Sequence, residues 1–114
     1  MSRLRADIWS AAFIRRHNDL GRMCVVSRKG HPVAGQIWIE VDHLNGDVSL
    51  FTPAPMSSMI DDSSERYFQK RFDHVEPATV RERIAREIDF DPDIWVIALE
   101  LRSDDLGIDV IPES

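Results

Sequence analysis

The sequence predicts an α+β fold, an antiparallel β-meander of about four to five strands with two helices packed on it. Two segments repeat apolar residues at helical spacing, and several shorter segments are continuously apolar or alternate with a period of two. Asn45-Gly46 stands between two alternating segments, which is the pattern of a tight hairpin. A chain of 114 residues fits one domain, residues 1–114.

Charge is spread unevenly over a chain whose net charge is −6. Residues 1–30 carry five more basic than acidic side chains, whereas residues 61–114 carry eight more acidic than basic ones. The basic first quarter, with Arg3, Arg5, Arg15 and Arg16, is either a docking region for an anionic partner or a solvated helix face with a basic edge strand. The acidic total argues against nucleic acid, because phosphate contacts supply most of the affinity for it.

Cysteine content and hydropathy indicate the cellular compartment that we expect for the protein. Cys24 is the only cysteine, so no internal disulfide can form. Because no signal peptide is evident either, we expect a reducing, cytoplasmic setting. No run approaches the ~20 apolar residues of a membrane span. No pattern in the sequence indicates a cofactor.

The N-terminal segments predict a short strand followed by a helix. Residues 3–8 alternate between apolar and charged side chains, which is typical of a strand. From Trp9 the spacing becomes helical, with Phe13 and His17 on the same face, and Gly21 is well placed to end the helix. We expect His17 to be partly buried and hydrogen-bonded, and no second ligand stands near it at helical spacing to make a metal site.

The middle of the chain predicts strands at residues 23–29 and 33–43, the second leading into the hairpin. With Asn45 and Gly46 as the two loop residues, paired positions sum to 91. That register places Trp38 diagonal to Phe51 on the outer face of the hairpin, where diagonal aromatic side chains come within reach. Either a helix covers this face, or it is an exposed patch with a binding role.

The second half predicts a loop, a strand, a helix, a central strand and a tail. Residues 53–65 are rich in Pro, Ser and Asp and predict a long loop, and residues 66–73 predict a strand with Phe68 and Phe72 on one side. A capping-box pattern at Thr79 predicts the second helix. The apolar run 94–101 predicts a strand buried on both faces, and the acidic tail 103–114 is expected to fray.

Three carboxylates, Asp89, Asp91 and Asp93, stand at alternate positions and resemble the start of a calcium loop. A calcium loop needs Gly at its sixth position, where this chain has Ile94. A weaker divalent site on Asp91 and Asp93 stays open as a metal hypothesis. The structural alternative is a helix stop and a Pro-set turn, in which Asp side chains bond nearby backbone and Phe90 and Trp95 pack on either side.

Nucleophilic and metal chemistry find little support elsewhere. Cys24 lies inside an apolar strand, where a buried, unreactive thiol is the expected state. No Gly-x-Ser-x-Gly sequence, phosphate-binding glycine loop or Cys/His metal spacing is present. His31, His43 and His74 are scattered along the sequence, and nothing in the pattern predicts that they converge.

Three stretches carry a family resemblance: RLRADIW, GQIWIEVDHLNGDVSLFTPAP and FDPDIWVIALELR. Together they resemble a small bacterial family, the domain of unknown function 1491, found mainly in alphaproteobacteria. The resemblance covers nearly the whole chain apart from the tail. It implies a single intact domain in a bacterial cytoplasm, and it implies no activity, ligand or catalytic residue.

Two hypotheses of function follow. The first is a non-enzymatic binding or protein-interaction module, acting on a protein partner or by self-association. It would use Arg15 and Arg16 of the basic region, or the Trp38/Phe51 face together with the 53–65 loop. The alternative is a small metal-dependent enzyme that uses the Asp91/Asp93 region.

Overall fold

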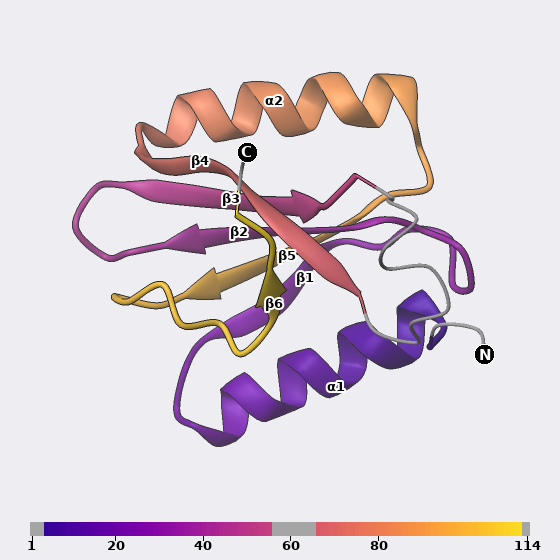
Figure 1. Cartoon of the computed structure of the whole chain (residues 1–114), viewed down its shortest axis with the longest axis horizontal. Helices are drawn as coiled ribbons and strands as arrows, with labels where there is room; N and C mark the ends of the chain where they lie inside the picture. The colour runs from indigo at the N-terminus through magenta and orange to yellow at the C-terminus, as the bar shows by residue number, and fades with distance from the viewer. Residues whose placement is uncertain (1–3, 56–65, 113–114) are drawn as a thin grey trace.

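A computed structural model of the chain describes residues 4–55 and 66–112. It confirms an α+β fold with two helices, arranged in three layers with one helix on each face of a single sheet (Figure 1). In chain order the elements are α1 (Ala6–Asp19), β1 (Cys24–Arg28), β2 (Ile37–Asp42), β3 (Val48–Pro53), β4 (Tyr67–Val75), α2 (Pro77–Phe90), β5 (Trp95–Glu100) and β6 (Asp109–Val110). Neither helix is long and apolar enough to cross a membrane.

The sheet is mixed, so the predicted antiparallel meander is only partly right. The six strands lie in the order β1-β5-β2-β3-β4-β6. Strands β2, β3 and β4 do form an antiparallel meander, but β5 enters between β1 and β2 and runs parallel to β2. Strand β6 runs parallel to β4. The predicted central strand is confirmed, because β5 has a neighbour on each side and is buried on both faces.

The first helix begins earlier than the sequence predicted, and the strand expected at residues 3–8 is wrong. Helix α1 starts at Ala6, and its buried residues are Ala6, Ser10, Phe13 and His17. These positions follow i, i+4, i+7 and i+11, which is one helix face. The alternation over residues 3–8 was too short to outweigh this longer helical pattern.

The predicted hairpin register is wrong by one residue. Leu44 takes a positive φ of 64°, and the His43 N–H donates to the Asp47 carbonyl at 3.1 Å, so the loop has three residues rather than two. Ile39 therefore pairs with Phe51, and Glu40 with Leu50. A slip of one residue moves every side chain of a strand to the opposite face relative to its partner.

Trp38 and Phe51 consequently do not share a face. Phe51 packs in the cluster beneath α1, whereas Trp38 packs in the cluster beneath α2. Both side chains are buried, at 3% and 1% exposure. The expectation of a covering helix is thus met for Trp38, and the exposed aromatic patch is wrong.

A bulge in β4 separates two aromatic residues that the sequence placed together. Leu50 pairs with Phe72 but Phe51 pairs with Lys70, so Arg71 is the extra residue. Phe68 consequently belongs to the cluster beneath α1, and Phe72 packs against the cluster beneath α2.

The second helix begins at Pro77, with Glu76 at the N-cap, so the capping role predicted for Thr79 is wrong. Its predicted buried stripe is confirmed, because Val80 and Ile84 are buried and Ile88 packs against the same cluster. The predicted turn after the helix is also present. The Asp91 carboxylate accepts the Asp93 N–H at 3.0 Å, although Phe90 is exposed and does not pack on the turn.

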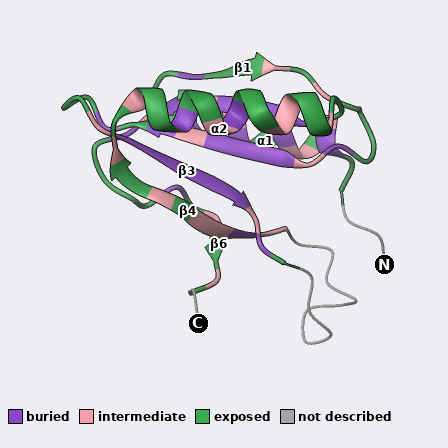
Figure 2. Cartoon of the chain, turned by 90° about the horizontal axis from the view of Figure 1, so that it is seen from above, coloured by how far each residue is buried: buried purple, intermediate pink, exposed green. Residues whose placement is uncertain are grey.

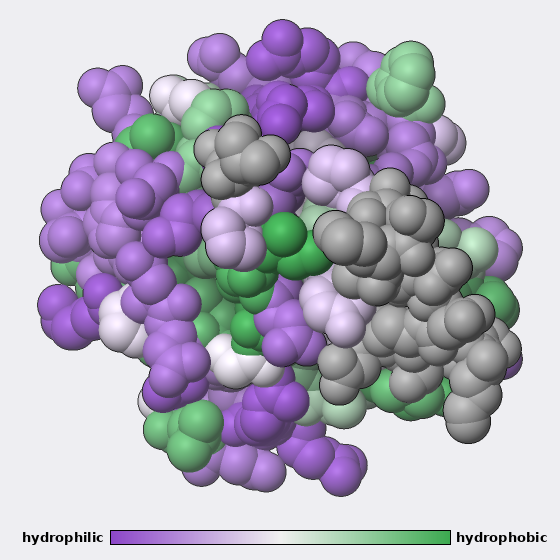
Figure 3. All heavy atoms as spheres, viewed as in Figure 1, coloured by the Kyte–Doolittle hydropathy of each residue, from purple (hydrophilic) through white to green (hydrophobic). Residues whose placement is uncertain are grey.

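Residues 103–112 of the acidic tail lie against the rest of the fold, and the expected fraying of residues 103–114 stays a prediction. Leu106 is buried in the cluster beneath α1, and its carbonyl lies 2.8 Å from Nε2 of His17. Strand β6 then closes the edge of the sheet beside β4. Apolar surface lies around β6 in the view of Figure 3, and Val110 of β6 is 41% exposed.

Of the predicted 53–65 loop, residues 56–65 lie outside the described residues.

Replacing Leu106 by Ala tests the docked tail. Loss of a fully buried Leu side chain leaves a cavity, and we expect Leu106→Ala to lower the free energy of unfolding by about 2–5 kcal/mol in urea titrations. Val110→Ala, on a half-exposed side chain of the same tail, is the control and should change stability by less than about 0.5 kcal/mol. Equal, small effects of both substitutions would show that the tail is frayed.

Candidate functional site

A concave surface lies on the α2 face of the sheet, between α2 and the edge strand β1. This groove has a volume of about 1070 Å³. Its floor comes from β1, β5 and β2, one wall comes from α2, and the Asp42–Val48 turn borders it. The residues that line the groove include Val25, Glu40, Asp42, Arg81, Ala98 and Glu100.

The groove exists because α2 covers only part of its face of the sheet. The helix contacts β3 and β4, and its buried residues Val80 and Ile84 pack over Trp38, Val48 and Leu50. Strand β1 runs beside α2 rather than beneath it (Figure 2). The strand register shows the resulting gradient of exposure, because Leu50, Glu40, Ala98 and Val25 form one row across the sheet. Leu50 is 0% exposed, whereas Val25 is 50% exposed.

Glu40 is the unusual residue of this row, because it places a carboxylate in the middle of the sheet. Partial burial raises the pKa of the Glu40 carboxyl, the Arg81 guanidinium lowers it, and the Asp42 carboxylate raises it further. Among the described residues no hydrogen bond contributes to this pKa shift. Asp42 and Glu100 pair across β2 and β5 in the neighbouring row, so one end of the groove is acidic.

The binding residues suggested by the sequence do not gather at this groove. Arg15 and Arg16 lie on α1, on the opposite side of the sheet, and both are exposed. Arg16 donates to the Gly107 carbonyl at 3.3 Å and lies 5.6 Å from the ring centre of Phe13, so it also holds the tail. Trp38 belongs to the core beneath α2, and Phe51 to the core beneath α1.

The Asp91/Asp93 region forms a structural joint rather than a ligand set. One Asp91 oxygen accepts the Asp93 N–H, and the other accepts the Gln36 side-chain amide at 2.8 Å. The Asp93 carbonyl accepts the His31 N–H at 2.9 Å. Among residues 4–55 and 66–112, Asp91 and Asp93 belong to no group of three metal-ligating side chains. The geometry does not favour the metal-dependent enzyme on these residues.

The structural roles expected for Cys24 and His17 are confirmed. Cys24 is buried and free, and burial raises the pKa of its thiol to about 11, so it is protonated at neutral pH. His17 is buried, and desolvation, with the nearby Arg22 and Arg16, lowers its pKa. Its ring donates from Nε2 to the Leu106 carbonyl and accepts from Arg22 at Nδ1, at 2.9 Å.

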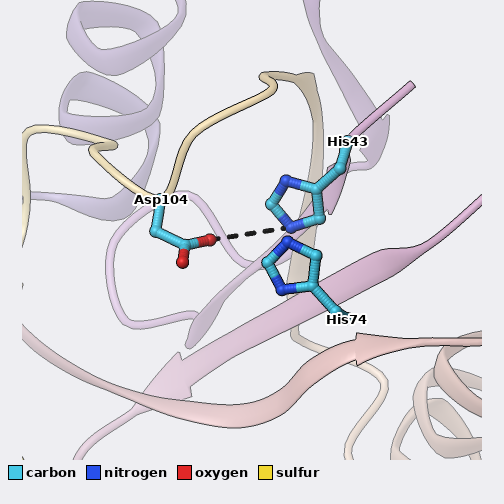
Figure 4. A group of neighbouring side chains, drawn as sticks. All are labelled: His43, His74 and Asp104. Carbon is cyan, nitrogen blue, oxygen red and sulfur yellow. Dashed lines mark ion pairs between the residues drawn. The ribbon is translucent and has the colours of Figure 1, made fainter. Parts of the chain in front are cut away.

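Two histidines that the sequence left scattered do converge. His43, which follows β2, stacks on His74 of β4 with ring centres 3.9 Å apart, and Asp104 of the tail lies beside them (Figure 4). In the described part of the chain this is the one group of three side chains with suitable atoms for holding a metal ion. Nothing in the sequence pattern predicted this convergence, which depends on strand pairing and on the docked tail.

Comparison with known proteins places the chain in a family. A model of the family described as protein of unknown function (DUF1491) matches residues 4–108. The chain belongs to this family. No curated protein matches it.

Solved structures of DUF1491 relatives share the fold. A solution structure of protein Atu0922 from A. tumefaciens has 30% identity and a TM-score of 0.85, with 98% of each chain covered. A crystal structure of a DUF1491 family protein from Caulobacter crescentus has 30% identity and a TM-score of 0.77, covering 96% of this chain and 98% of that one. These relatives confirm the suspected family and its bacterial distribution, and nothing in them indicates an enzymatic activity.

Sequence reasoning missed Glu40 and the histidine cluster for different reasons. Glu40 carried a usable signal, because an acidic residue in the middle of an apolar strand is uncommon. The shifted register hid it by placing it opposite Phe51. His43, His74 and Asp104 carried no signal, since each is some thirty residues from the next along the chain.

Neutralising Glu40 tests the electrostatics of the groove. The pKa of the Glu40 carboxyl is higher in the folded state than its ordinary value of 4.5. The protonated carboxyl therefore stabilises the folded state fully below pH 4.5, and this stabilisation is lost as the pH rises through the raised pKa. We therefore expect Glu40→Gln to raise the melting temperature at pH 7 by a few degrees, and to change it little at pH 4. Glu82→Gln, on the exposed side of α2, is the matched control and should change neither temperature. A lower melting temperature for Glu40→Gln at pH 7 would contradict this account.

Proposed function

We propose that this protein is a non-enzymatic interaction module that binds a segment of a partner protein in the groove between α2 and β1. The observation that carries the proposal is a half-buried carboxylate, Glu40, on the largely apolar floor of the groove. Such a carboxylate costs stability in the free protein, and a cationic partner group would offset that cost.

The groove's chemistry favours a particular partner. Its apolar floor and wall fit aliphatic or aromatic side chains, and the Glu40, Asp42 and Glu100 carboxylates favour an adjacent lysine or arginine. The same carboxylates, with a net charge of −6, would repel a nucleic acid backbone. The expected partner segment therefore combines apolar residues with a neighbouring basic residue.

The exposed edge of strand β1 could in principle pair with a second copy of the chain, but one of its residues is already hydrogen-bonded. Asn18 caps this edge, because its side chain accepts the Cys24 N–H at 3.1 Å and donates to the Cys24 carbonyl at 3.3 Å. A side chain that occupies edge backbone groups opposes pairing with a second copy of the strand. Self-association by pairing of β1 strands is therefore disfavoured, and the proposal commits to a different protein as the occupant of the groove.

The buried, protonated Cys24 supports a cytoplasmic location as part of this proposal. Arg15 is exposed on α1, on the opposite side of the sheet from the groove. That it contacts an anionic partner there stays a prediction.

A displayed random-peptide library tests the proposed function without a known partner. We expect the immobilised protein to enrich peptides that combine apolar residues with an adjacent lysine or arginine. Val25→Lys, which places a charge in the groove at a half-exposed position, should weaken binding of those peptides at least tenfold, and Glu40→Gln should weaken it less.

Arg15→Gln is the control on the opposite face and should leave the affinity unchanged. Failure to enrich any such sequence would contradict the proposed groove. Enriched peptides that bind Val25→Lys as well as the original protein would do the same.

A further inference from the structure

His43, His74 and Asp104 form a cluster on the far side of the β2–β3 hairpin from the groove's apolar floor. Each offers one ligand atom, and these atoms all lie within 4.8 Å of one another. Nε2 of His43 lies 3.7 Å from Oδ1 of Asp104. Figure 4 shows both imidazoles stacked on the side toward which the Asp104 carboxylate points. The cluster joins three separate segments of the chain at one point.

Hydrogen bonds hold the His43 ring in one orientation. His43 is 1% exposed, and its Nδ1 lies 2.8 Å from the Leu101 carbonyl, which can only accept. In the neutral ring Nδ1 therefore carries the proton, and Nε2 presents a lone pair. In this structure that lone pair accepts the hydrogen of the Ser49 hydroxyl at 2.8 Å, so a metal ion at Nε2 would replace this hydrogen bond. A histidine whose Nδ1–H is held by a backbone carbonyl is the usual arrangement of a metal ligand.

His74 is held in the same way on its outer side. Its Nδ1 donates to Oδ1 of Asp73 at 2.8 Å, which leaves Nε2 directed toward His43. The His74 backbone takes a positive φ of 54°, and its N–H donates to Oγ of Ser49 at 3.0 Å. Strained backbone conformations of this kind are concentrated at functional sites. In this conformation the His74 ring stacks on His43.

We propose that this cluster binds a divalent transition-metal ion of the zinc type through Nε2 of His43, Nε2 of His74 and a carboxylate oxygen of Asp104. Two imidazoles and one carboxylate suit zinc and its neighbours, whereas magnesium and calcium prefer oxygen ligands alone. The Leu101 carbonyl and the Asp73 carboxylate are the outer partners that orient the two rings.

Binding requires a small local adjustment. Tetrahedral zinc with bonds of about 2.0–2.2 Å places its ligand atoms about 3.3–3.6 Å apart, so the 3.7 Å separation between His43 and Asp104 is close to the required distance. The interplanar angle of the stacked rings is 9°, and the rings must open for both nitrogens to converge. The side chains of His74 and Asp104 are 36% and 44% exposed and can move, while the buried His43 stays fixed.

Lys70 opposes the metal and gives the proposal a sharp test. Its Nζ lies 3.2 Å from Oδ2 of Asp104 and 3.3 Å from Oδ1 of Asp73. A fixed positive charge beside a ligand weakens cation binding. Removing this charge should therefore tighten the site.

Calorimetric titration of the full chain with Zn²⁺, after treatment with a chelator, tests the proposal. We expect one ion per chain and a higher melting temperature in excess Zn²⁺, with no comparable effect of Mg²⁺ or Ca²⁺. His74→Asn and Asp104→Asn should each weaken zinc binding at least about tenfold. Asparagine suits the positive φ at position 74, so this variant removes the ligand without new backbone strain. Lys70→Met, which keeps the apolar stem, should bind zinc more tightly than the original protein.

Asp93→Asn is the matched control for Asp104→Asn, since it makes the same charge change at an exposed site outside the cluster, and it should leave zinc affinity unchanged. Circular dichroism of each variant establishes that it is folded. The proposal is overturned if no saturable one-to-one binding occurs up to millimolar Zn²⁺. It is also overturned if folded His74→Asn and Asp104→Asn bind zinc as the original protein does.

Discussion

Strand β5 and the joint that leads into it are the constraint on which the rest of the structure depends. The strand lies between β1 and β2, and its side chains enter the clusters on both faces of the sheet. The joint fixes where β5 starts, because Asp93 accepts from His31 and the Trp95 indole donates to the His31 carbonyl at 2.8 Å. Gly30 and Gly35 allow this contact, since a Cβ at either position would lie within 2.5 Å of the Asp93 carbonyl oxygen. The helix stop, the 30–35 loop and the central strand therefore form one unit.

The position of α2 divides the sheet face beneath it into a covered half and an open half. Over β3 and β4 the helix completes an apolar core around Trp38 and Leu50. Toward β1 the same face is open, and Glu40 lies at the border between the two halves. Partial burial of the Glu40 carboxyl at this border disfavours its charged form, and this supports the proposal that the open half binds a partner. The histidine cluster and the groove lie at different places on the hairpin, so the proposed metal site and the proposed binding groove do not depend on each other.

Local patterns in the sequence predicted those helices and strands whose apolar pattern is long or is bounded by a turn residue such as proline. The stripe of Val80, Ile84 and Ile88 gave α2, and the apolar run 94–101 gave β5, because burial on one face or on both leaves a direct trace in residue type. The Pro92 turn and the buried state of Cys24 and His17 followed from similarly local chemistry. The hairpin register did not, because a positive φ at Leu44 lengthened the loop by one residue, and non-glycine residues seldom adopt that conformation.

By itself the sequence determined the α+β class, the two helices, the central strand, the family and the absence of a recognisable catalytic motif. The tertiary structure alone decided which strands are neighbours, on which face each aromatic residue lies, and which polar residues meet. The physical reason is the distance along the chain over which each kind of interaction acts. Helical and strand periodicities are set by neighbours a few residues apart, whereas insertion of β5 between β1 and β2, the partial cover by α2 and the meeting of His43, His74 and Asp104 depend on contacts between segments far apart in the chain.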